Sequence, residues 1–352
     1  MAMRRLRHLC VSMAALLLGL TWYLSGGRGV PGLATTWRPS LSPPPPPEAG
    51  SSNSRRRLEI KPGFQVVIPR RLRGVLPRDW PRKDRETWLN AVYYPWAVGR
   101  VNDACRLLGI RFLTNVTSSQ TRALVSFPGS GNTWVRATLE AVGGVFTGSV
   151  YQDGFLAASG LLGEMLRFDS GLTVLQKTHG DATKSPALNE FSRHHVREFG
   201  CRGVLLFRHP AAAIVAHRHL DEGGHLGHAP LAAFNGTEWR QYVAGKIAVW
   251  RDLYSHWLRE CEPSGLRIAV YERFRADLGG AVRRLLADLG VPVDENRIQC
   301  LLKYGSGSVE RRKLYQGVEL FDEDQREQMA RVVDTVNKLL LAKKNFSLPY
   351  LR

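Results

Sequence analysis

Ten consecutive residues, 126–135, have the composition of a phosphate-binding turn. They read Ser-Phe-Pro-Gly-Ser-Gly-Asn-Thr-Trp-Val and join an apolar run at 123–127 to a helix-like run that begins at Thr133. Backbone N–H groups at a helix N-terminus carry partial positive charge and lack helical acceptors, so small residues there give an anion access. The pattern predicts that a nucleotide phosphate is bound by Gly129, Ser130, Gly131, Asn132 and Thr133.

The turn differs from that of the P-loop nucleotidases. Those proteins need Gly-x-x-x-x-Gly-Lys-Ser/Thr, and residues 126–135 have neither the terminal lysine nor that glycine spacing. No aspartate in a position typical of magnesium binding follows a predicted strand. Both differences argue against a nucleotide kinase.

Three further apolar runs end in polar residues that could bind or transform a ligand. The runs 172–177, 203–207 and 267–271 lead into Lys177-Thr178-His179, Arg208-His209-Pro210 and Tyr271-Glu272. In an open parallel sheet, ligands bind at the edge formed by the carboxyl ends of the strands. We therefore predict an α/β fold with a central parallel sheet flanked by helices.

The four segments, in this order, resemble the motifs of sulfotransferases, commonly Tyr-Pro-Lys-Ser-Gly-Thr-Thr-Trp, Lys-Thr-His, Arg-Asn/Asp-Pro and Tyr-Glu-Asp-Leu. The nearest form is the Golgi group that carries WSC domains, the sialate O-sulfotransferases, whose loop also reads Phe-Pro-Gly-Ser-Gly-Asn-Thr-Trp. The resemblance covers residues 123–313. It implies a P-loop-like sulfotransferase fold and transfer of sulfate from 3′-phosphoadenosine-5′-phosphosulfate (PAPS) to a glycan hydroxyl, with sialic acid as the favoured acceptor. We expect this chain to lack the cysteine-rich WSC modules.

The resemblance also implies roles for single residues. His179 would be the base for the acceptor hydroxyl, with a titration range suited to Golgi pH. Lys177, on the same side of its strand, would reach the charge of the leaving phosphate. Trp134 would pack on the adenine, and Arg208 would bind the 3′-phosphate with bidentate geometry. A late basic loop would add contacts to that phosphate from Arg311, Arg312 and Lys313.

Two residues depart from the sulfotransferase pattern. Gly129 stands where many members have a lysine that contacts the transferred group, and Ala216 stands where a serine commonly helps to bind the 3′-phosphate. Lys177 or Arg136 would then have to supply the missing positive charge. The alternative is a non-catalytic lumenal protein that keeps the fold and binds nucleotide or acidic glycan.

The chain's N-terminal part predicts a membrane-anchored protein. A basic tail at 1–8 precedes a segment, 9–27, whose uncharged apolar run is typical of a signal-anchor helix, with a cleaved signal peptide as the alternative. Positive charge on its N-terminal side predicts type II topology. Residues 28–70 are rich in Pro and Arg and predict an extended stem, which leaves 71–352 as one lumenal sulfotransferase domain. We expect a single-pass Golgi membrane protein.

Other features fit a lumenal location. Lysine plus arginine exceed aspartate plus glutamate by 49 to 31, a net charge of +18 that implies an anionic partner, and a lumenal protein would meet nucleotide donors and acidic glycans rather than nucleic acid. Four cysteines permit two disulfides in any of three pairings. No Cys-x-x-Cys pair indicates structural zinc. The sequence has five cysteines: Cys10 lies in the predicted anchor, and the four of the lumenal part are Cys105, Cys201, Cys261 and Cys300. The N-glycosylation acceptors are Asn115, Asn235 and Asn345.

Histidines gather around residues 222–224, namely His217, His219, His225 and His228. Their spacing does not place them on one helix face, so we expect no metal ion here. We hypothesise a mobile loop that faces the acceptor and is partly protonated at Golgi pH. The aromatic-rich run 239–261 and the run 321–341 are predicted to be helices of the core.

Overall fold

A computed structural model describes residues 65–66, 91–97, 104–113, 121–180, 196–306, 314–315 and 317–348. All of these residues belong to one compact unit, residues 59–352. Within the described ranges, no helix is long and apolar enough to span a membrane. The predicted tail and anchor, nearly all of the stem, Asn115, Arg311, Arg312 and Lys313 lie outside the described residues.

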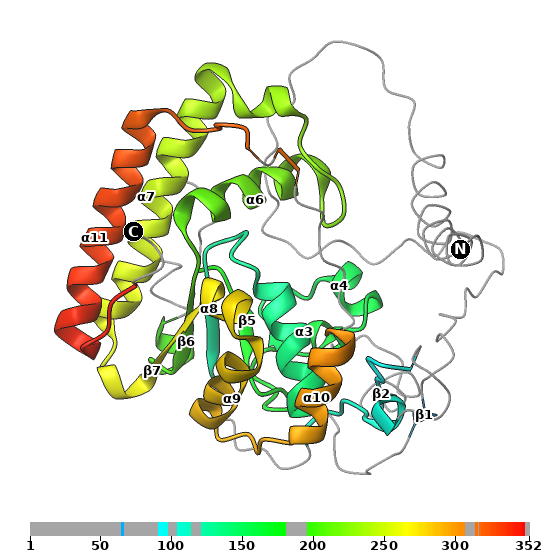
Figure 1. The fold of residues 1–352 in the computed structure, drawn as a ribbon. Coiled ribbons are helices and arrows are strands. Elements are labelled where there is room, and N and C mark those ends of the chain that lie inside the picture. Colours follow the sequence, from blue (N-terminus) through cyan, green and yellow to red (C-terminus); the bar gives the residue numbers. More distant parts are fainter. Residues whose placement is uncertain are drawn as a thin grey trace, which may run out of the picture. The chain divides into compact units, whose positions relative to one another are not determined.

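A five-stranded parallel sheet forms the centre of the described fold (Figure 1). All of its strand pairs are parallel. β3 comes first in the sequence among these five strands and lies in the middle of the sheet, so the later strands are added first on one side of it and then on the other. This confirms the predicted α/β class. The strands, in spatial order, are β4 (Gly148–Ser149), β5 (Gln176–Thr178), β3 (Ala123–Ser126), β6 (Gly203–Phe207) and β7 (Leu266–Val270).

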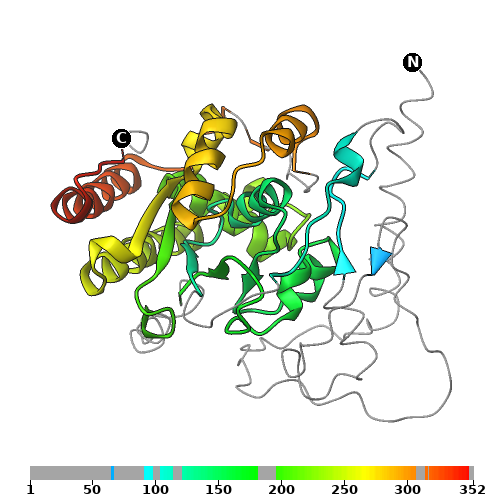
Figure 2. The same cartoon turned by 90° about the horizontal axis from the view of Figure 1, so that it is seen from below.

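The two central strands are buried along their whole length because helices cover both faces of the sheet (Figure 2). Side chains alternate between the faces: Val125 and Leu205 join one core cluster, and Leu124 and Val204 join the other. The first cluster packs on α6 (Pro210–Gly223), α7 (Gly236–Glu260) and α11 (Glu323–Lys344); the second packs on α3 (Asn132–Gly143), α9 (Leu278–Leu289) and α10 (Glu295–Tyr304).

Helix α7 confirms that the aromatic run at 239–261 belongs to the core. Trp250, Tyr254 and Trp257 are at most 1% exposed. The Tyr254 hydroxyl donates to the Leu206 carbonyl (2.6 Å) and accepts from the Phe127 N–H (3.1 Å). It thereby ties the end of β6 to the residue that follows β3. Helix α11 lies along α7 and confirms the second predicted helix.

Two predicted boundaries were wrong. The strand predicted at 172–177 is formed by residues 176–178, and Tyr271 begins a helix instead of ending a strand.

The remaining described elements lie outside the central sheet. They are β1 (Gln65–Val66), which pairs antiparallel with β2 (Ala91–Val92), η1 (Ala104–Leu107), α4 (Gly154–Ala158), η3 (Leu162–Met165), η5 (Leu231–Phe234), η6 (Pro263–Gly265) and α8 (Tyr271–Ala276).

Two disulfides select one of the three possible pairings. Cys105 in η1 is joined to Cys300 in α10, across 195 residues of sequence. Cys201, just before β6, is joined to Cys261 at the end of α7, across 60 residues. Each disulfide fastens a segment outside the sheet to a helix that covers one of its faces.

The Cys105–Cys300 disulfide should contribute substantially to stability. Replacing both residues by serine should lower the free energy of unfolding by about 2–5 kcal/mol, since a cross-link over a long loop restricts the unfolded chain. On the same grounds, the Cys201→Ser/Cys261→Ser variant should lose about 1 kcal/mol less. Thermal and denaturant unfolding of both variants, without reductant, would measure this; unfolding midpoints equal to wild type would contradict it.

Candidate active site

The phosphate loop, residues 127–133, connects β3 to α3. Gly129 and Gly131 both have φ = +82°, in the left-handed region. A Cβ atom on Gly129 would lie 2.3 Å from the Ala213 carbonyl oxygen, and one on Gly131 would lie 2.3 Å from the Tyr271 ring. Glycine is therefore needed at both positions for backbone conformation and for space.

Helix α3 presents unpaired donors to this loop. Its first helical hydrogen bond runs from the Val135 N–H to the Gly131 carbonyl (3.0 Å). The N–H groups of residues 132–134 therefore have no acceptor within the helix. The Ser130 hydroxyl is buried at this turn, next to the Tyr254 hydroxyl. Such amides and a buried hydroxyl fit the anionic phosphate group predicted for Gly129 to Thr133.

Arg208 lies directly against the phosphate loop. It follows β6, and its Nη1 donates to the Gly129 carbonyl at 2.6 Å. Its guanidinium lies 4.5 Å from the centre of the Tyr271 ring, and the Trp250 indole donates to its carbonyl (3.2 Å). Stacking and backbone contacts fix this cation beside the loop, where it could bind a second phosphate.

Trp134, half-buried at the start of α3, belongs to an aromatic cluster. It contacts the Tyr271 and Phe274 rings edge-on at 5.6 and 6.4 Å, and the Arg275 guanidinium lies 5.5 Å from its own ring. The cluster is built from α3 and α8, next to the phosphate loop. The structure thus brings Trp134, Arg208 and the loop to one edge of the sheet.

His179 follows β5 and faces β3. Its Nδ1 lies 2.8 Å from the Ser126 carbonyl oxygen and 3.4 Å from Ser126 Oγ, which accepts from the Asn132 amide (3.0 Å). Because a carbonyl only accepts, Nδ1 must carry the hydrogen, which leaves the lone pair on Nε2. The imidazole is therefore oriented as a proton acceptor through Nε2.

His179 does not keep the unperturbed titration range of histidine, which would suit Golgi pH, in the protein alone. Burial, and then the charge of Lys177, lower the pKa of His179 to about 3. The ring is neutral at physiological pH and needs no deprotonation before it can act as a base. An anion bound nearby would raise this pKa again.

Lys177 is buried, with 8% of its surface exposed, and lies among charged residues behind His179. Its pKa is lowered by burial, which the neighbouring Glu164 opposes. The ammonium lies 5.5 Å from the centre of the Tyr151 ring. A desolvated cation at this place would respond strongly to negative charge developing nearby.

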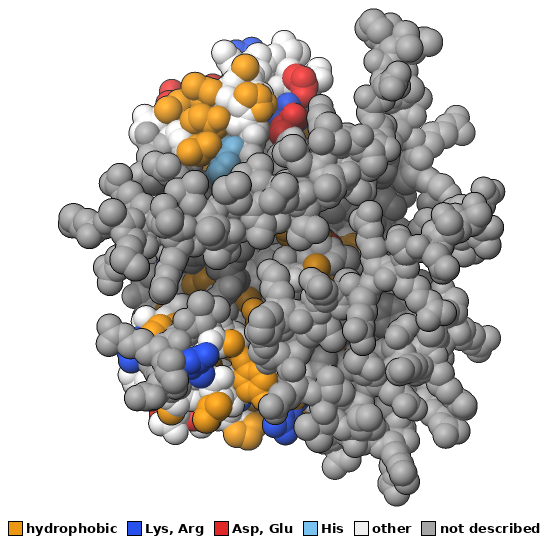
Figure 3. Space-filling view, turned by 90° about the vertical axis from the view of Figure 1, so that its right-hand side faces the viewer, with side chains coloured by type: hydrophobic (Ala, Val, Ile, Leu, Met, Phe, Trp, Pro, Cys, Tyr) orange, Lys and Arg blue, Asp and Glu red, His pale blue; other side chains and the backbone are white. Residues whose placement is uncertain are grey.

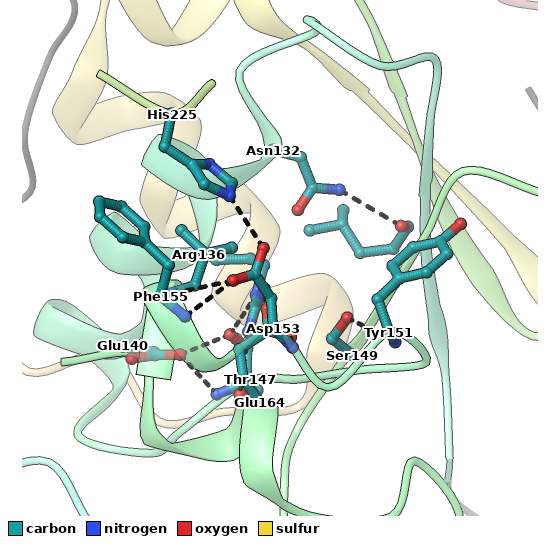
Figure 4. A network of polar contacts seen from close by, with 12 residues as sticks. Asn132, Arg136, Glu140, Thr147, Ser149, Tyr151, Asp153, Phe155, Glu164 and His225 are labelled. Carbon is teal, nitrogen blue, oxygen red and sulfur yellow. Dashed lines mark hydrogen bonds and ion pairs between the residues drawn. The ribbon is translucent and has the colours of Figure 1, made fainter. Parts of the chain in front are cut away.

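Arg136 cannot supply the charge that Gly129 lacks. It is fully buried and forms an ion pair with Glu164, and its Nε donates to Thr147 Oγ1 at 2.8 Å (Figure 4). These contacts bind the guanidinium to the core of the protein. Of the two cations predicted as substitutes for the family's lysine, Lys177 remains.

The two departures from the family pattern lie next to each other. A Cβ atom on Gly129 would come within 3.2 Å of Ala216 Cβ and within 2.8 Å of the His217 N–H nitrogen. Helix α6 therefore packs so closely on the phosphate loop that no side chain fits at position 129. A lysine there would displace the helix that carries Ala216.

The four histidines do not form one loop. His217 and His219 are buried on α6: His217 Nε2 lies 3.4 Å from Asp221 Oδ1, and His219 Nδ1 accepts from the Ala229 N–H (3.0 Å). His225 Nε2 contacts Asp153 Oδ2 at 2.9 Å. Among the described residues, no group of three or more His, Cys, Asp or Glu could hold a metal ion.

Sequence reasoning missed Tyr151, which contacts both candidate catalytic residues. Its hydroxyl accepts from the His179 N–H (2.8 Å) and donates to the Gly180 carbonyl (3.2 Å), while its ring stacks on the imidazole at 5.6 Å. It follows β4, a strand of only two residues, Gly148–Ser149. An isolated tyrosine after so short a strand gave no pattern to detect.

Two of the predicted glycosylation acceptors are exposed at helix ends. Asn235 caps the start of α7 and Asn345 caps the end of α11. A cavity of about 560 Å³ lies beside Asn235, and its lining includes Trp239, Arg240 and Gln325 but no residue of the phosphate loop. It is distinct from the candidate active site.

A phosphate loop after the central strand, with polar residues at the ends of the neighbouring strands, defines a P-loop-like α/β fold of the sulfotransferase kind. Similar solved structures include mouse sulfotransferase SULT7A1 complexed with PAP (TM-score 0.42, 15% identity, covering 63% of this chain and 85% of that one). Retinol dehydratase in complex with androsterone and inactive cofactor PAP is another (TM-score 0.39, 15% identity, 74% and 89%). No protein-family model matches the chain.

Sequence comparison gives the family. A WSCD family member of Drosophila pseudoobscura pseudoobscura is 32% identical over 226 residues, covering 63% of this chain and 67% of that protein. Members from Aedes aegypti and Drosophila melanogaster are 33% and 31% identical, covering 54% and 58% of this chain. The chain belongs to the WSCD family. It spans less than two thirds of the length of these last two relatives, 57% and 61%.

Adding a side chain at Gly129 should damage the site. Gly129→Ala should lose at least about 2 kcal/mol of stability, because a Cβ there meets both the left-handed backbone and α6. Gly290→Ala is the matched control: Gly290 also has a left-handed backbone, with φ = +68° and ψ = +25°, but has no atom within 4 Å of its ideal Cβ. It should lose about 1 kcal/mol. Thermal unfolding would compare them; equal losses would mean that α6 does not restrict position 129.

His179 should stay neutral across the physiological range. Its folded pKa of about 3 lies below the ordinary 6.5, so the unfolded chain binds more protons between these values and stability falls as pH falls through them. The His179 ring signals in NMR, assigned by comparison with His179→Gln, should not shift between about pH 5 and 8. A midpoint near the ordinary value would contradict the burial described here.

Proposed function

We propose that this chain is a sulfotransferase that uses PAPS as donor and transfers sulfate to a hydroxyl group of a glycan. One observation carries the proposal: His179, an imidazole held with Nε2 as its proton acceptor, adjoins the strand that leads into the phosphate loop. A hydroxyl acceptor needs such a base, and a phosphorylated donor needs such a loop. The family resemblance favours sialic acid as the acceptor.

Different residues of the chain would bind the donor, take the acceptor's proton and stabilise the leaving phosphate. Amides of residues 132–134 and the Ser130 hydroxyl would hold the 5′-phosphate, and Arg208 would hold the 3′-phosphate. PAPS supplies an activated sulfuryl group when it is bound. His179 Nε2 takes the proton of the acceptor hydroxyl, and Lys177 stabilises the negative charge of the departing phosphate.

The proposal includes a lumenal, Golgi location with type II topology. Two disulfides in the domain support an oxidising compartment, since cytosolic proteins of mesophiles seldom contain structural disulfides. The exposed positions of Asn235 and Asn345 are compatible with N-glycosylation. In that compartment, glycans are the abundant hydroxyl acceptors.

A second candidate is a non-catalytic member that binds nucleotide without transferring sulfate. The packing of α6 over Gly129 favours it, because it leaves no room for the family's lysine. Nucleotide binding is common to both candidates, so it is tested first and transfer second.

Donor binding requires no knowledge of the acceptor. Calorimetric titration of the full chain with 3′,5′-adenosine bisphosphate should give a dissociation constant in the micromolar range. Arg208→Ala should weaken binding about tenfold or more, because charge-assisted hydrogen bonds to phosphate are lost. Arg283→Ala is the control, since this arginine pairs with Glu295 on an exposed helix surface. No binding by a folded protein would overturn the proposed donor site.

Lys177 separates the two candidates. In an enzyme, Lys177→Ala should lower turnover of labelled PAPS on a mixed glycoprotein acceptor while leaving affinity for the bisphosphate within about threefold, since it acts on charge that develops during transfer. Equal loss of both would contradict this role. Nucleotide binding with no transfer to any acceptor would favour the non-catalytic member.

A further inference from the structure

We infer that a group of cations at the amino ends of the sheet strands forms a second binding site, which takes the sulfate or carboxylate groups of an acidic glycan. This group, the basic edge, consists of Arg122, Arg202, Arg267 and Lys344. Arg122 precedes β3 and the phosphate loop follows it, so a strand about 13 Å long separates the basic edge from the donor site. The inference rests on the lumenal location proposed above.

Arg122 and Arg202 lie side by side. They come just before β3 and β6, two parallel strands that pair with Ala123 opposite Gly203. The Ala123 N–H donates to the Arg202 carbonyl (2.9 Å), which extends the pairing to the two arginines. Neighbouring strands are about 4.8 Å apart and paired residues lie on the same face, so the two side chains leave the sheet at adjacent points.

The end of helix α9 brings the third arginine to the same place. Arg122 Nη1 donates to the Leu289 carbonyl (2.8 Å). Arg267 Nε lies 3.4 Å from Oδ1 of Asp288, the residue before Leu289. Arg122 and Arg267 thus contact consecutive residues of one helix end, and Arg202 is the neighbour of Arg122.

Lys344 adds a fourth charge to this group. Its ammonium donates to the Leu266 carbonyl at 2.7 Å, directly before Arg267 in the chain. Burial and then the charge of Arg267 lower the pKa of Lys344. Burial and then the charges of Arg202 and Arg267 lower the pKa of Arg122. The cations of the basic edge therefore repel one another in the protein without ligand.

Helix α9 compensates only part of this positive charge. Within the part of the chain that the structure describes, Asp288 is the only carboxylate paired with a cation of the basic edge. The last carbonyls of a helix add about half a negative charge. Lysines and arginines visible on the face shown in Figure 3 lie in separate places, whereas those of the basic edge adjoin one another. A bound anion would relieve their repulsion.

The side chains of the basic edge suit sulfate and carboxylate groups. A guanidinium can donate two parallel hydrogen bonds to either group. Arg122 uses Nη1 for the Leu289 carbonyl and keeps its other N–H groups, and Arg202 and Arg267 are also partly exposed. Adjacent arginines on neighbouring strands match an oligosaccharide whose charged groups recur along its length.

An acidic glycan fits the proposed compartment better than other polyanions. A lumenal domain does not meet nucleic acid, and the strongly anionic leaflet of a membrane is the cytoplasmic one. The two disulfides support an oxidising, lumenal location. Bound at the basic edge, a glycan chain stays on the protein without occupying the donor site.

The test measures oligosaccharide binding with the donor site already filled. The full chain, saturated with 3′,5′-adenosine bisphosphate, is titrated by calorimetry with a heparin hexasaccharide, a hexamer of sialic acid and neutral maltohexaose. At least one acidic probe should bind and maltohexaose should not. Binding should weaken about tenfold or more between about 0.05 and 0.3 M salt, because the contacts are ionic.

Matched variants locate the binding. Arg202→Ala and Arg267→Ala should each weaken it about two- to fivefold, the range of an exposed ion pair, and Arg202→Glu about tenfold or more. Arg251→Ala is the control for Arg267→Ala: these arginines are 42% and 41% exposed and each pairs with one aspartate. It should leave binding unchanged. All four variants should bind the bisphosphate as wild type does, and circular dichroism and thermal unfolding would show that they are folded.

Three results would overturn the site. They are no binding of either acidic probe, equal loss in Arg251→Ala and Arg267→Ala, and unchanged binding by Arg202→Glu. Binding to vesicles of phosphatidylcholine and phosphatidylserine without binding to the oligosaccharides would overturn the glycan and indicate a membrane surface. Failure to bind the bisphosphate would instead overturn the donor site of the proposed function.

Discussion

The close contact between α6 and the phosphate loop is the constraint on which the site depends. It is possible only because residue 129 is a glycine, which leaves no Cβ between the loop and α6 and accepts the backbone conformation at φ = +82°. Gly131 allows the same close approach to Tyr271 of α8. The contact places Arg208 against the loop and brings Ala216 beside Gly129. It also accounts for the absence of the lysine that many sulfotransferases have here, since position 129 cannot hold a side chain.

A second constraint is the group of charges buried beneath the site. Arg136 and Glu164 form a fully buried ion pair, and Thr147 connects them to Glu140, whose pKa is raised to about 7 by burial. Ion pairs of this kind contribute little net stability, but breaking one is costly. Their effect here is to fix the segment that carries Asp153 and to surround Lys177 with charge of both signs.

The groups suited to donor binding and those suited to proton transfer lie at the ends of different strands. Groups that would bind the donor come from the phosphate loop, which continues β3, and from the end of β6 on one side of it, whereas Lys177 and His179 come from the end of β5 on the other side. Tyr151 extends the second set toward solvent, where an acceptor would approach.

The sequence by itself determined the features that depend on neighbouring residues. Apolar runs such as 203–207 are central strands because a parallel sheet buries both faces, and glycines between a strand and a helix form the phosphate loop because local backbone conformation requires them. The tertiary structure decided what depends on contacts between distant residues. It paired Cys105 with Cys300, used Arg136 in an ion pair, brought Tyr151 to His179 and lowered the histidine's pKa. Pairing and desolvation arise from segments that only folding brings together, so local sequence patterns carry no record of them.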